Sequence, residues 1–458
     1  MLAAMPPSPT FSALPGDASD GSGGERPEPP AGARSRRSEA GDQCPGALRL
    51  HAADDGALAR IRVPGGVLDA GGTEVLAEVA RRLGDGDVHL TSRGNVQIRG
   101  LGEECGGELA ALLRASGLLP SERHERVRNV VASPLSGLDG RGVRDVRPWL
   151  VALDALVCAS EAAAGLSGRF LFALDDGRGD MDALGADVTL RALDGGDAAL
   201  RVGPVRDALR VPDADAPRAA LAAAEAFLDA ARPTGAWRVA DLADGARPVL
   251  DALARRLRRD GVPFTPTTLP APEIDGTSGT PPTGLVRGPD GSVSLSVGVP
   301  LGRLRGAQWR LLADLAREHG SGGLRLTPWR GVIVPDVAAG RADAALEALH
   351  AAGLVTGPGS PWTGVGACAG RPGCARSRAD VRAEAAAALG AVGPLPVYWS
   401  GCERRCGRPR GTWVDVLALG DGHRVTRVRD GVPGASADVP DDPSALAAAI
   451  AAARAADG

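Results

Sequence analysis

The sequence repeats itself at an offset of 236 residues, and this internal duplication constrains the fold more than any other feature. Val63 and Pro64 align with Val299 and Pro300 without a gap. The same offset aligns further residues of the first copy, namely Gly66, Leu76, Ala77, Ala80, Arg81, Gly84, Gly86, Leu90, Thr91, Val96, Gly117 and Leu118. Self-similarity at one fixed offset is the signature of a repeated structural unit, so we expect two copies of one fold.

Each copy predicts the same order of elements. A helix after the aligned proline carries apolar residues such as Leu76 and Val79 on one face. A short strand follows at 88–91, or at 324–327 in the second copy, and then come an alternating strand and a second helix. This order is that of a ferredoxin-like α+β half. We expect the two halves to pair around a pseudo-twofold axis.

The composition between the repeats predicts the domain boundaries. The N-terminal stretch is rich in Pro, Gly and Ser, as in disordered tails, and a second Pro- and Thr-rich stretch separates the repeats as a linker. The chain therefore divides into a tail (1–43), a first ferredoxin-like half (44–125), a first larger α+β domain (126–264), a linker (265–283), a second ferredoxin-like half (284–356) and a cysteine-bearing α+β domain (357–458). The predicted fold class is α+β.

The composition also excludes several functions. All 52 basic residues are arginine, because the chain contains no lysine, and this rules out a P-loop lysine and a Schiff-base lysine. A net charge of −4 and only 3% aromatic residues argue against nucleic acid as a partner. No apolar run reaches the roughly 18 residues of a membrane span, and the N-terminus lacks the order of a signal peptide. We expect a cytoplasmic protein, since an odd number of cysteines (seven) fits a reducing compartment.

Four cysteines near the C-terminus predict a metal site. Cys368 and Cys374 form a C-x5-C pair, and Cys402 and Cys406 form a C-x3-C pair. Thiolates are soft ligands that suit zinc or iron–sulfur clusters. Structural zinc sites favour knuckles such as C-x2-C, so the spacing favours a 4Fe–4S cluster over zinc or over unligated thiols. The remaining cysteines are expected to be small buried hydrophobic residues, and they are Cys44, Cys105 and Cys158.

The cysteine motif resembles the cluster signature of the sirohaem-dependent sulfite and nitrite reductases. RIRVPGG (60–66), LTSRGNVQIRG (90–100) and VRNVVASPLSG (127–137) are similar to that superfamily's opening repeat and to the segment after it. The resemblance covers about 44–438. Within the superfamily, GRFLFALDDG (168–177) and LRLTPWRGVIVP (324–335) resemble the precorrin-3B synthases most closely, as does CPGALRL at the start of the first half.

The narrower resemblance implies a monooxygenase of aerobic cobalamin biosynthesis. Precorrin-3A would be hydroxylated by molecular oxygen at the meso carbon between rings A and D, and the ring A acetate would close a γ-lactone to give precorrin-3B. The resemblance implies a 4Fe–4S cluster on Cys368, Cys374, Cys402 and Cys406, a mononuclear non-haem iron, and an external NADH-linked electron donor. By analogy, the Cys406 thiolate would lie nearest the tetrapyrrole.

One departure from the superfamily separates the possible functions. The reductases hold their small anion with two lysines in a K-F-K-like strand, whereas this chain has Arg169-Phe170-Leu171 there and so lacks one of the two cations. This favours a tetrapyrrole substrate in the place of sirohaem. A sirohaem-dependent nitrite or sulfite reductase is the alternative, followed by a tetrapyrrole-binding protein without catalysis and by a zinc-stapled structural protein.

Arginines are the expected ligands of the substrate's carboxylates, because the guanidinium fork binds carboxylates in a bidentate way. By family position the expected residues are Arg62, Arg93, Arg128, Arg169 and Arg330. A mononuclear iron would need the usual two histidines and a carboxylate, and no such set is evident in the sequence. His89 is the histidine of greatest interest, and Asp175 with Asp176 is expected to form a turn. No catalytic residue can be named.

Overall fold

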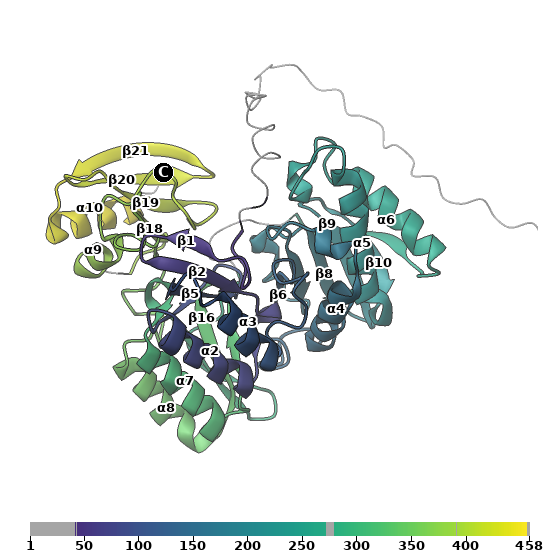
Figure 1. The fold of residues 1–458 in the computed structure, drawn as a ribbon, viewed down its shortest axis with the longest axis horizontal. Helices are drawn as coiled ribbons and strands as arrows, with labels where there is room; N and C mark the ends of the chain where they lie inside the picture. Colours follow the sequence, from purple (N-terminus) through teal and green to yellow (C-terminus); the bar gives the residue numbers. More distant parts are fainter. Residues whose placement is uncertain (1–41, 43, 272–278, 391, 456–458) are drawn as a thin grey trace, which may run out of the picture. The chain divides into compact units, whose positions relative to one another are not determined.

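A computed structural model describes residues 42, 44–271, 279–390 and 392–455 (Figure 1). Apart from residue 42, the predicted tail lies outside the described residues, as does the 272–278 part of the predicted linker. The described residues form four β-sheets, of which two belong to the duplicated halves and two to the larger domains. None of the described helices is both long and apolar enough to cross a lipid bilayer.

The two halves have the same order of elements, as predicted. The first half contains β1 (His51–Ala53), β2 (Gly56–Ile61), β3 (Val67–Leu68), α2 (Ala70–Leu83), β4 (Val88–Leu90), β5 (Val96–Leu101) and α3 (Gly106–Ala115). The second half contains β12 (Gly284–Arg287), β13 (Val293–Gly298), β14 (Arg303–Leu304), α7 (Gly306–His319), β15 (Leu324–Leu326), β16 (Gly331–Val337) and α8 (Ala339–Ala351). The Asp69 carboxylate caps α2 by accepting from the Gly72 N–H at 2.7 Å. Gly84 ends the helix, where a Cβ would come within 2.6 Å of the Ile98 side chain.

Each half contributes a two-residue strand, β3 or β14, to the sheet of the other half. The sheet orders are β1-β2-β5-β4-β14 and β12-β13-β16-β15-β3. Arg303 of β14 pairs with His89, and Val67 of β3 pairs with Arg325, so each pair is the counterpart of the other at the 236-residue offset. The indole N–H of Trp309 also donates to the Thr73 carbonyl at 3.0 Å. This exchange confirms the pseudo-twofold pairing and joins both halves in one hydrophobic core.

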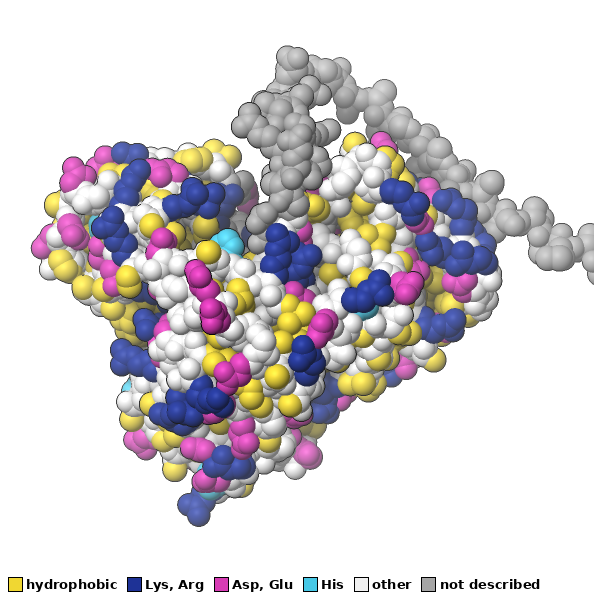
Figure 2. All heavy atoms as spheres, viewed as in Figure 1, with side chains coloured by type: hydrophobic (Ala, Val, Ile, Leu, Met, Phe, Trp, Pro, Cys, Tyr) yellow, Lys and Arg dark blue, Asp and Glu magenta, His cyan; other side chains and the backbone are white. Residues whose placement is uncertain are grey.

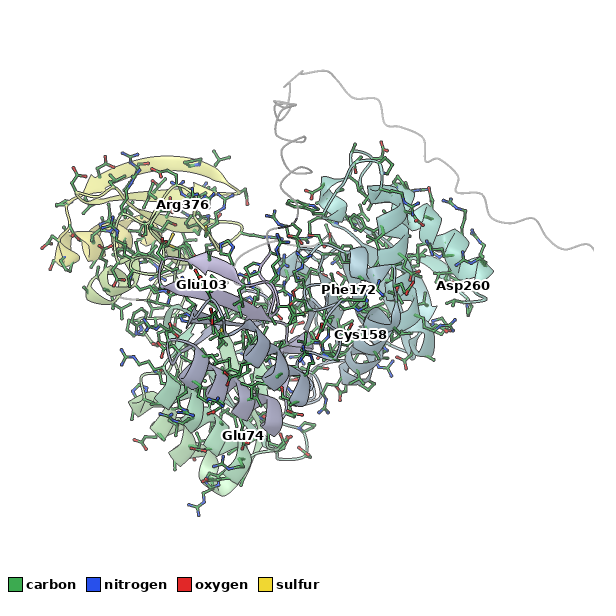
Figure 3. The ribbon with its side chains drawn as sticks, in the orientation of Figure 1. Glu74, Glu103, Cys158, Phe172, Asp260 and Arg376 are labelled. Carbon is green, nitrogen blue, oxygen red and sulfur yellow. The ribbon has the colours of Figure 1, made fainter. Side chains whose placement is uncertain are left out.

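The first larger domain has a mixed sheet covered by helices. Its elements are β6 (Val130–Ala132), α4 (Arg147–Ala159), β7 (Phe172–Asp175), β8 (Val188–Leu193), β9 (Asp197–Val202), β10 (Asp207–Pro212), α5 (Ala216–Ala231), α6 (Arg247–Arg259) and β11 (Thr265–Thr268). Strands β6, β7 and β8 are parallel, and the others are antiparallel. Phe170, Phe172 and Phe227 pack together in its core, where Figure 3 labels Phe172. The first four residues of the predicted linker form β11, because they complete the sheet at its β10 edge.

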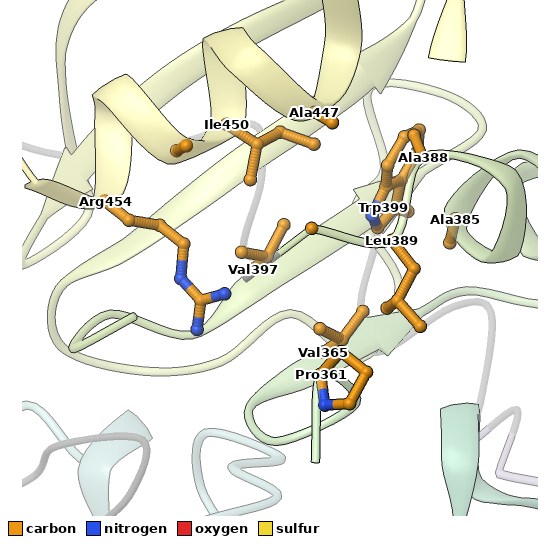
Figure 4. Close-up of a pocket in the computed structure, with 12 residues that line it drawn as sticks. Pro361, Val365, Ala385, Ala388, Leu389, Val397, Trp399, Ala447, Ile450 and Arg454 are labelled. Carbon is orange, nitrogen blue, oxygen red and sulfur yellow. The ribbon is translucent and has the colours of Figure 1, made fainter. Parts of the chain in front are cut away.

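The cysteine-bearing domain repeats this mixed arrangement. Its elements are β17 (Val365–Ala367), α9 (Val381–Ala387), β18 (Val397–Ser400), β19 (Trp413–Ala418), β20 (His423–Arg429), β21 (Val432–Val439) and α10 (Pro443–Ala455). Again the first three strands are parallel and the rest antiparallel. A small, mostly apolar pocket lies between α9, α10 and the sheet, with Trp399 and Ile450 in its wall (Figure 4). Arg454 at its edge donates to the carbonyls of Gly393 and Leu395, so this pocket belongs to the core of the domain.

Charges on the surface are of mixed sign. Figure 2 shows basic and acidic side chains interspersed over the visible face. Many of them form exposed ion pairs within one helix, such as Arg82 with Glu78 and Arg317 with Asp314. Exposed pairs of this kind each contribute at most about 1 kcal/mol to stability.

Candidate functional site

The four cysteines lie at the carboxyl ends of two parallel strands. Cys368 follows β17 and Cys402 follows β18, and parallel strands end at the same edge of a sheet. The Cys368 N–H donates to the Trp399 carbonyl at 3.0 Å, and the Gly401 N–H donates to the Cys368 sulfur at 3.3 Å. The sheet thus brings the C-x5-C and C-x3-C pairs together.

The described cysteine sulfurs are not arranged as the ligands of a single zinc ion. Burial raises the pKa of the Cys406 thiol, and the neighbouring thiolates of Cys402, Cys368 and Cys374 raise it further, so all four lie within electrostatic reach. Among the described residues, no three cysteine sulfurs lie within 4.8 Å of one another. Tetrahedral zinc with Zn–S bonds of about 2.3 Å needs sulfurs about 3.8 Å apart. A 4Fe–4S cluster is larger and holds its four thiolates further apart.

A turn of the first half holds the C-x5-C loop. The Asp55 carboxylate and the Arg99 guanidinium form a bidentate pair at 2.7 and 2.8 Å. Arg99 also donates to the Gly373 carbonyl at 2.6 Å, and Asp54 accepts from the Ala375 N–H. These residues flank Cys374 from a position more than 270 residues away in the sequence. Sequence reasoning missed them, since nothing local in the sequence marks so distant a contact.

The C-x3-C loop is held from within its own domain. The Tyr398 hydroxyl donates to the Cys406 carbonyl at 2.5 Å. Arg405 lies between the two cysteines with a φ of 46° and donates to the buried Asp415 carboxylate at 2.6 Å. Gly407 has a φ of 83°, and a Cβ there would come within 2.7 Å of the Tyr398 oxygen. This loop conformation therefore depends on Arg405, Asp415 and Gly407.

The first larger domain has an equivalent site without cysteines. Ser133 follows β6 as Cys368 follows β17, and its N–H donates to the Leu174 carbonyl at 3.0 Å. The Asp176 N–H donates to the Ser133 oxygen at 3.0 Å, which matches the bond from Gly401 to the Cys368 sulfur. Ser133 donates in turn to Asp180, and Arg178 forms a bidentate pair with Asp176. In the first larger domain, the edge that corresponds to the cysteine-bearing edge is thus closed by its own hydrogen bonds and ion pairs.

The expected iron site is not formed by the described residues. Asp175, Asp176 and Asp180 are the one group of three or more His, Cys, Asp or Glu side chains there with ligand atoms within 4.8 Å. The Asp175 carboxylate accepts from the backbone N–H groups of Gly177, Gly179 and Met181, as in the predicted turn. No histidine joins this group, so the residues do not fit a site of two histidines and one carboxylate.

Arg62 and Arg93 lie together next to the first larger domain. Arg62 is only 3% exposed, donates from Nε to the Arg126 carbonyl at 3.0 Å, and has no partner for Nη2 in the described part of the chain. Burial and the neighbouring Arg60 and Arg93 lower its pKa to about 9. Arg93 donates to the carbonyls of Gly168 and Arg169 at 3.2 and 3.1 Å. The result is a desolvated basic cluster with unused donor capacity.

The other three predicted arginines are placed differently. Arg169 is exposed and lies 4.6 Å from the centre of the Trp237 ring. Arg330, in a left-handed conformation with φ of 57°, extends to Gly407 beside Cys406. Arg128 is buried and forms a bidentate pair with Asp154 at 2.8 and 2.7 Å, while also donating to the Leu118 carbonyl. Its donors are engaged within the protein, so Arg128 stabilises the fold there.

An apolar patch replaces the second cation of the reductase strand. Leu171 is 2% exposed and packs with Val131, Ala173 and Met181. Trp329, from the TPWRG segment, is partly buried and packs against this group. Leu171 and Trp329, which come from two segments that resemble the precorrin-3B synthases, are therefore neighbours in space.

A family model and a solved structure are similar to this chain. A family model described as the nitrite/sulfite reductase ferredoxin-like half domain matches residues 51–116 and 286–352, which are the two duplicated halves. A solved structure of the NirA protein of Mycobacterium tuberculosis has the same fold, with a TM-score of 0.66 and 20% identity over 85% of this chain and 79% of that one. The chain thus contains two copies of the ferredoxin-like half domain of the nitrite/sulfite reductases.

Its relatives carry two kinds of name. A ferredoxin–nitrite reductase of Synechococcus elongatus is 35% identical over 26% of this chain and 25% of its own length. A precorrin-3B synthase of a Sinorhizobium species is 28% identical over 33% of this chain and 32% of its own. An assimilatory ferredoxin-dependent nitrite reductase of Haloferax mediterranei is 25% identical over 69% of this chain and 61% of its own. The chain thus matches less than two thirds of the length of each of these relatives.

Proposed function

We propose that this protein is an iron–sulfur oxidoreductase that acts as a precorrin-3B synthase. In this reaction one atom of O2 enters precorrin-3A as the meso hydroxyl group, and the other leaves as water. An NADH-linked donor supplies two electrons and, with the solvent, two protons. The ring A acetate then closes the γ-lactone.

The observation that carries this proposal is the apolar patch of Leu171 and Trp329. A site for sulfite or nitrite needs cations to offset the anion's charge, and a second cation at position 171 would lie among Val131, Ala173 and Met181. Burying an unpaired charge there would cost several kcal/mol. The patch is buried and holds no such charge, and the partly buried Trp329 at its edge is an aromatic group that suits contact with the face of a large macrocycle.

The arginine cluster supports a substrate edged with carboxylates. Arg62 keeps an unpaired Nη2 donor in a buried position, and Arg93 lies beside it. A carboxylate that reached Arg62 would form a charge-assisted hydrogen bond, about twice as strong as a neutral one. It would also relieve the repulsion between the arginines. A tetrapyrrole with acetate and propionate groups has this chemistry.

The four cysteines would hold the cluster. Cys368, Cys374, Cys402 and Cys406 supply the thiolates, and the contacts of Arg99 and Tyr398 fix the two loops that carry them. When bound, a 4Fe–4S cluster supplies one-electron transfer. We assign no step to a mononuclear iron, because the described residues do not form a site that fits it.

The second candidate is a sirohaem-dependent nitrite or sulfite reductase. It is favoured by Arg169, which keeps one cation of the reductase strand, and by the relatives named as nitrite reductases. Both candidates use the same cluster and basic site, so the bound tetrapyrrole and the oxidant distinguish them.

The test is turnover with labelled oxygen. Anaerobically purified protein is mixed with precorrin-3A and a reductant and then exposed to ¹⁸O2, and the product is analysed by mass spectrometry. The proposal predicts one labelled oxygen atom in the product. The Cys406→Ser variant is expected to lose turnover, and Cys158→Ser, a matched change on α4, is expected to keep it. Reduction of nitrite or sulfite with no labelled product would favour the second candidate.

A further inference from the structure

A guanidinium beside the cysteines has no carboxylate partner. Arg382, the second residue of α9, donates from Nε to the Cys368 carbonyl at 3.1 Å and from Nη1 to the Nδ1 of His89 at 3.4 Å. Among the described residues, no carboxylate oxygen lies within the 4.0 Å of an ion pair from Arg382. Two nearby arginines do have such partners, since Arg99 pairs with Asp55 and Arg303 with Asp87.

The chain of contacts fixes how Arg382 is held. Arginine only donates hydrogen bonds, so Nδ1 of His89 must accept and the ring is neutral with its proton on Nε2. That Nε2 lies 3.6 Å from the Asp85 carboxylate, on the far side of the ring. His89 is 5% exposed, and burial lowers its pKa, which keeps it neutral. His89 of the first half thus holds the Arg382 guanidinium of the cysteine-bearing domain next to Cys368.

The second half differs from the first at the position of His89. The counterpart of His89 is Arg325, which donates directly to the carbonyls of Pro134 and Ser136, next to Ser133. Ser133 is the counterpart of Cys368. On the side without cysteines the half-domain strand therefore supplies the guanidinium itself. On the cysteine side it supplies a neutral histidine, and the guanidinium comes from α9.

We propose that Arg382, positioned by His89, is the counter-ion of the iron–sulfur cluster and raises the cluster's reduction potential. The inference rests on the proposed cluster. Four thiolates and the cluster carry net negative charge, which increases when an electron is added. A desolvated cation near one ligand stabilises the reduced form more than the oxidised form, because charges interact strongly where water is excluded. The cluster would in turn supply the negative partner that Arg382 lacks.

The test is a redox titration of the cluster, followed by electron paramagnetic resonance, in the anaerobically purified full chain. Arg382→Gln is expected to lower the equilibrium constant for one-electron reduction at least tenfold, which is about 59 mV. Arg382→Lys keeps the charge and is expected to retain most of the potential. His89→Leu frees the guanidinium and is expected to shift the potential part of the way down. The control Arg303→Gln removes a half-exposed, paired charge and is expected to change the potential much less.

The outcomes separate this inference from the proposed cofactor. A normal cluster whose potential is the same in Arg382→Gln and Arg303→Gln would overturn the counter-ion role alone. If Arg382→Gln does not fold, the other two variants decide. A reduction potential that is unchanged in His89→Leu would overturn the role of His89, and a potential that is lowered in Arg382→Lys would overturn the role of the positive charge. A wild-type protein without labile sulfide would overturn the cofactor and this inference together.

Discussion

Substitution of two buried arginines by methionine is expected to change different properties: Arg128→Met should lower stability, and Arg62→Met should weaken ligand binding. Arg128→Met would leave the Asp154 carboxylate, which is 21% exposed, without its bidentate partner and the Leu118 carbonyl without its donor. Breaking a buried pair costs about 3–5 kcal/mol, and partial exposure of Asp154 puts the expected loss at about 3 kcal/mol. Arg62→Met removes a desolvated guanidinium with an unused donor, so the expected change in stability is within about 1 kcal/mol.

Native-state hydrogen exchange measures this difference where it arises. Arg128 lies two residues before β6, so amide exchange in β6 should speed up on the order of 100-fold in Arg128→Met, since about 1.4 kcal/mol corresponds to tenfold. Binding of uroporphyrin, a stable tetrapyrrole with acetate and propionate groups, is the second readout. Arg62→Met should weaken it by about tenfold or more, the worth of one charge-assisted hydrogen bond, and Arg128→Met should leave it nearly unchanged. The reverse pattern, with binding lost in Arg128→Met and exchange unaltered, would refute the reasoning from hydrogen-bond partners.

Three further predictions concern the patch, the cysteine loop and the buried histidine. Trp329→Ala should weaken uroporphyrin binding about tenfold while Trp329→Phe keeps most of it, as measured by fluorescence titration; equal loss in both would argue against an apolar contact. Arg99→Met removes the hydrogen bond to the Gly373 carbonyl, so iron loss to a chelator should be several-fold faster than in the exposed control Arg82→Met. Equal rates of iron loss would contradict the role of Arg99 in holding the C-x5-C loop. Burial lowers the pKa of His89, so as the pH falls the unfolded chain binds a proton at this histidine before the folded chain does, and the free energy of unfolding should fall as the pH drops below about 6.5. Urea unfolding between pH 7 and 5 should show a weaker pH dependence of stability in His89→Gln, and an unaltered pH dependence would count against this role of His89.

The duplication made most of the fold predictable. Local periodicity around Leu76 and Val96 indicated the helices and strands of each half, and the fixed offset indicated that the halves are equivalent. The exchange of β3 and β14 was not predictable, because each has only two residues and pairs with a strand of the other half. The β11 strand was hidden in a Pro- and Thr-rich segment, since pairing at the edge of a sheet overrides local composition.

The candidate site was predictable only in part. The spacing of Cys368, Cys374, Cys402 and Cys406 marks them as ligands from local sequence, and this stays a prediction. The partner of Arg128 is Asp154, 26 residues away, and family position alone could not show that the pair is internal. The contacts of Arg99 and His89 with the cysteine-bearing domain span more than 270 residues, so they are a product of tertiary structure and leave no local pattern.

The measurement that tests the central claim most directly is the absorption spectrum of anaerobically purified protein, with iron and acid-labile sulfide counted on the same sample. The account predicts a broad sulfur-to-iron shoulder, about four iron and four sulfide per chain as in one 4Fe–4S cluster, and no sharp haem-type bands. Strong Soret and visible bands from a bound iron tetrapyrrole would contradict it and identify a nitrite or sulfite reductase instead.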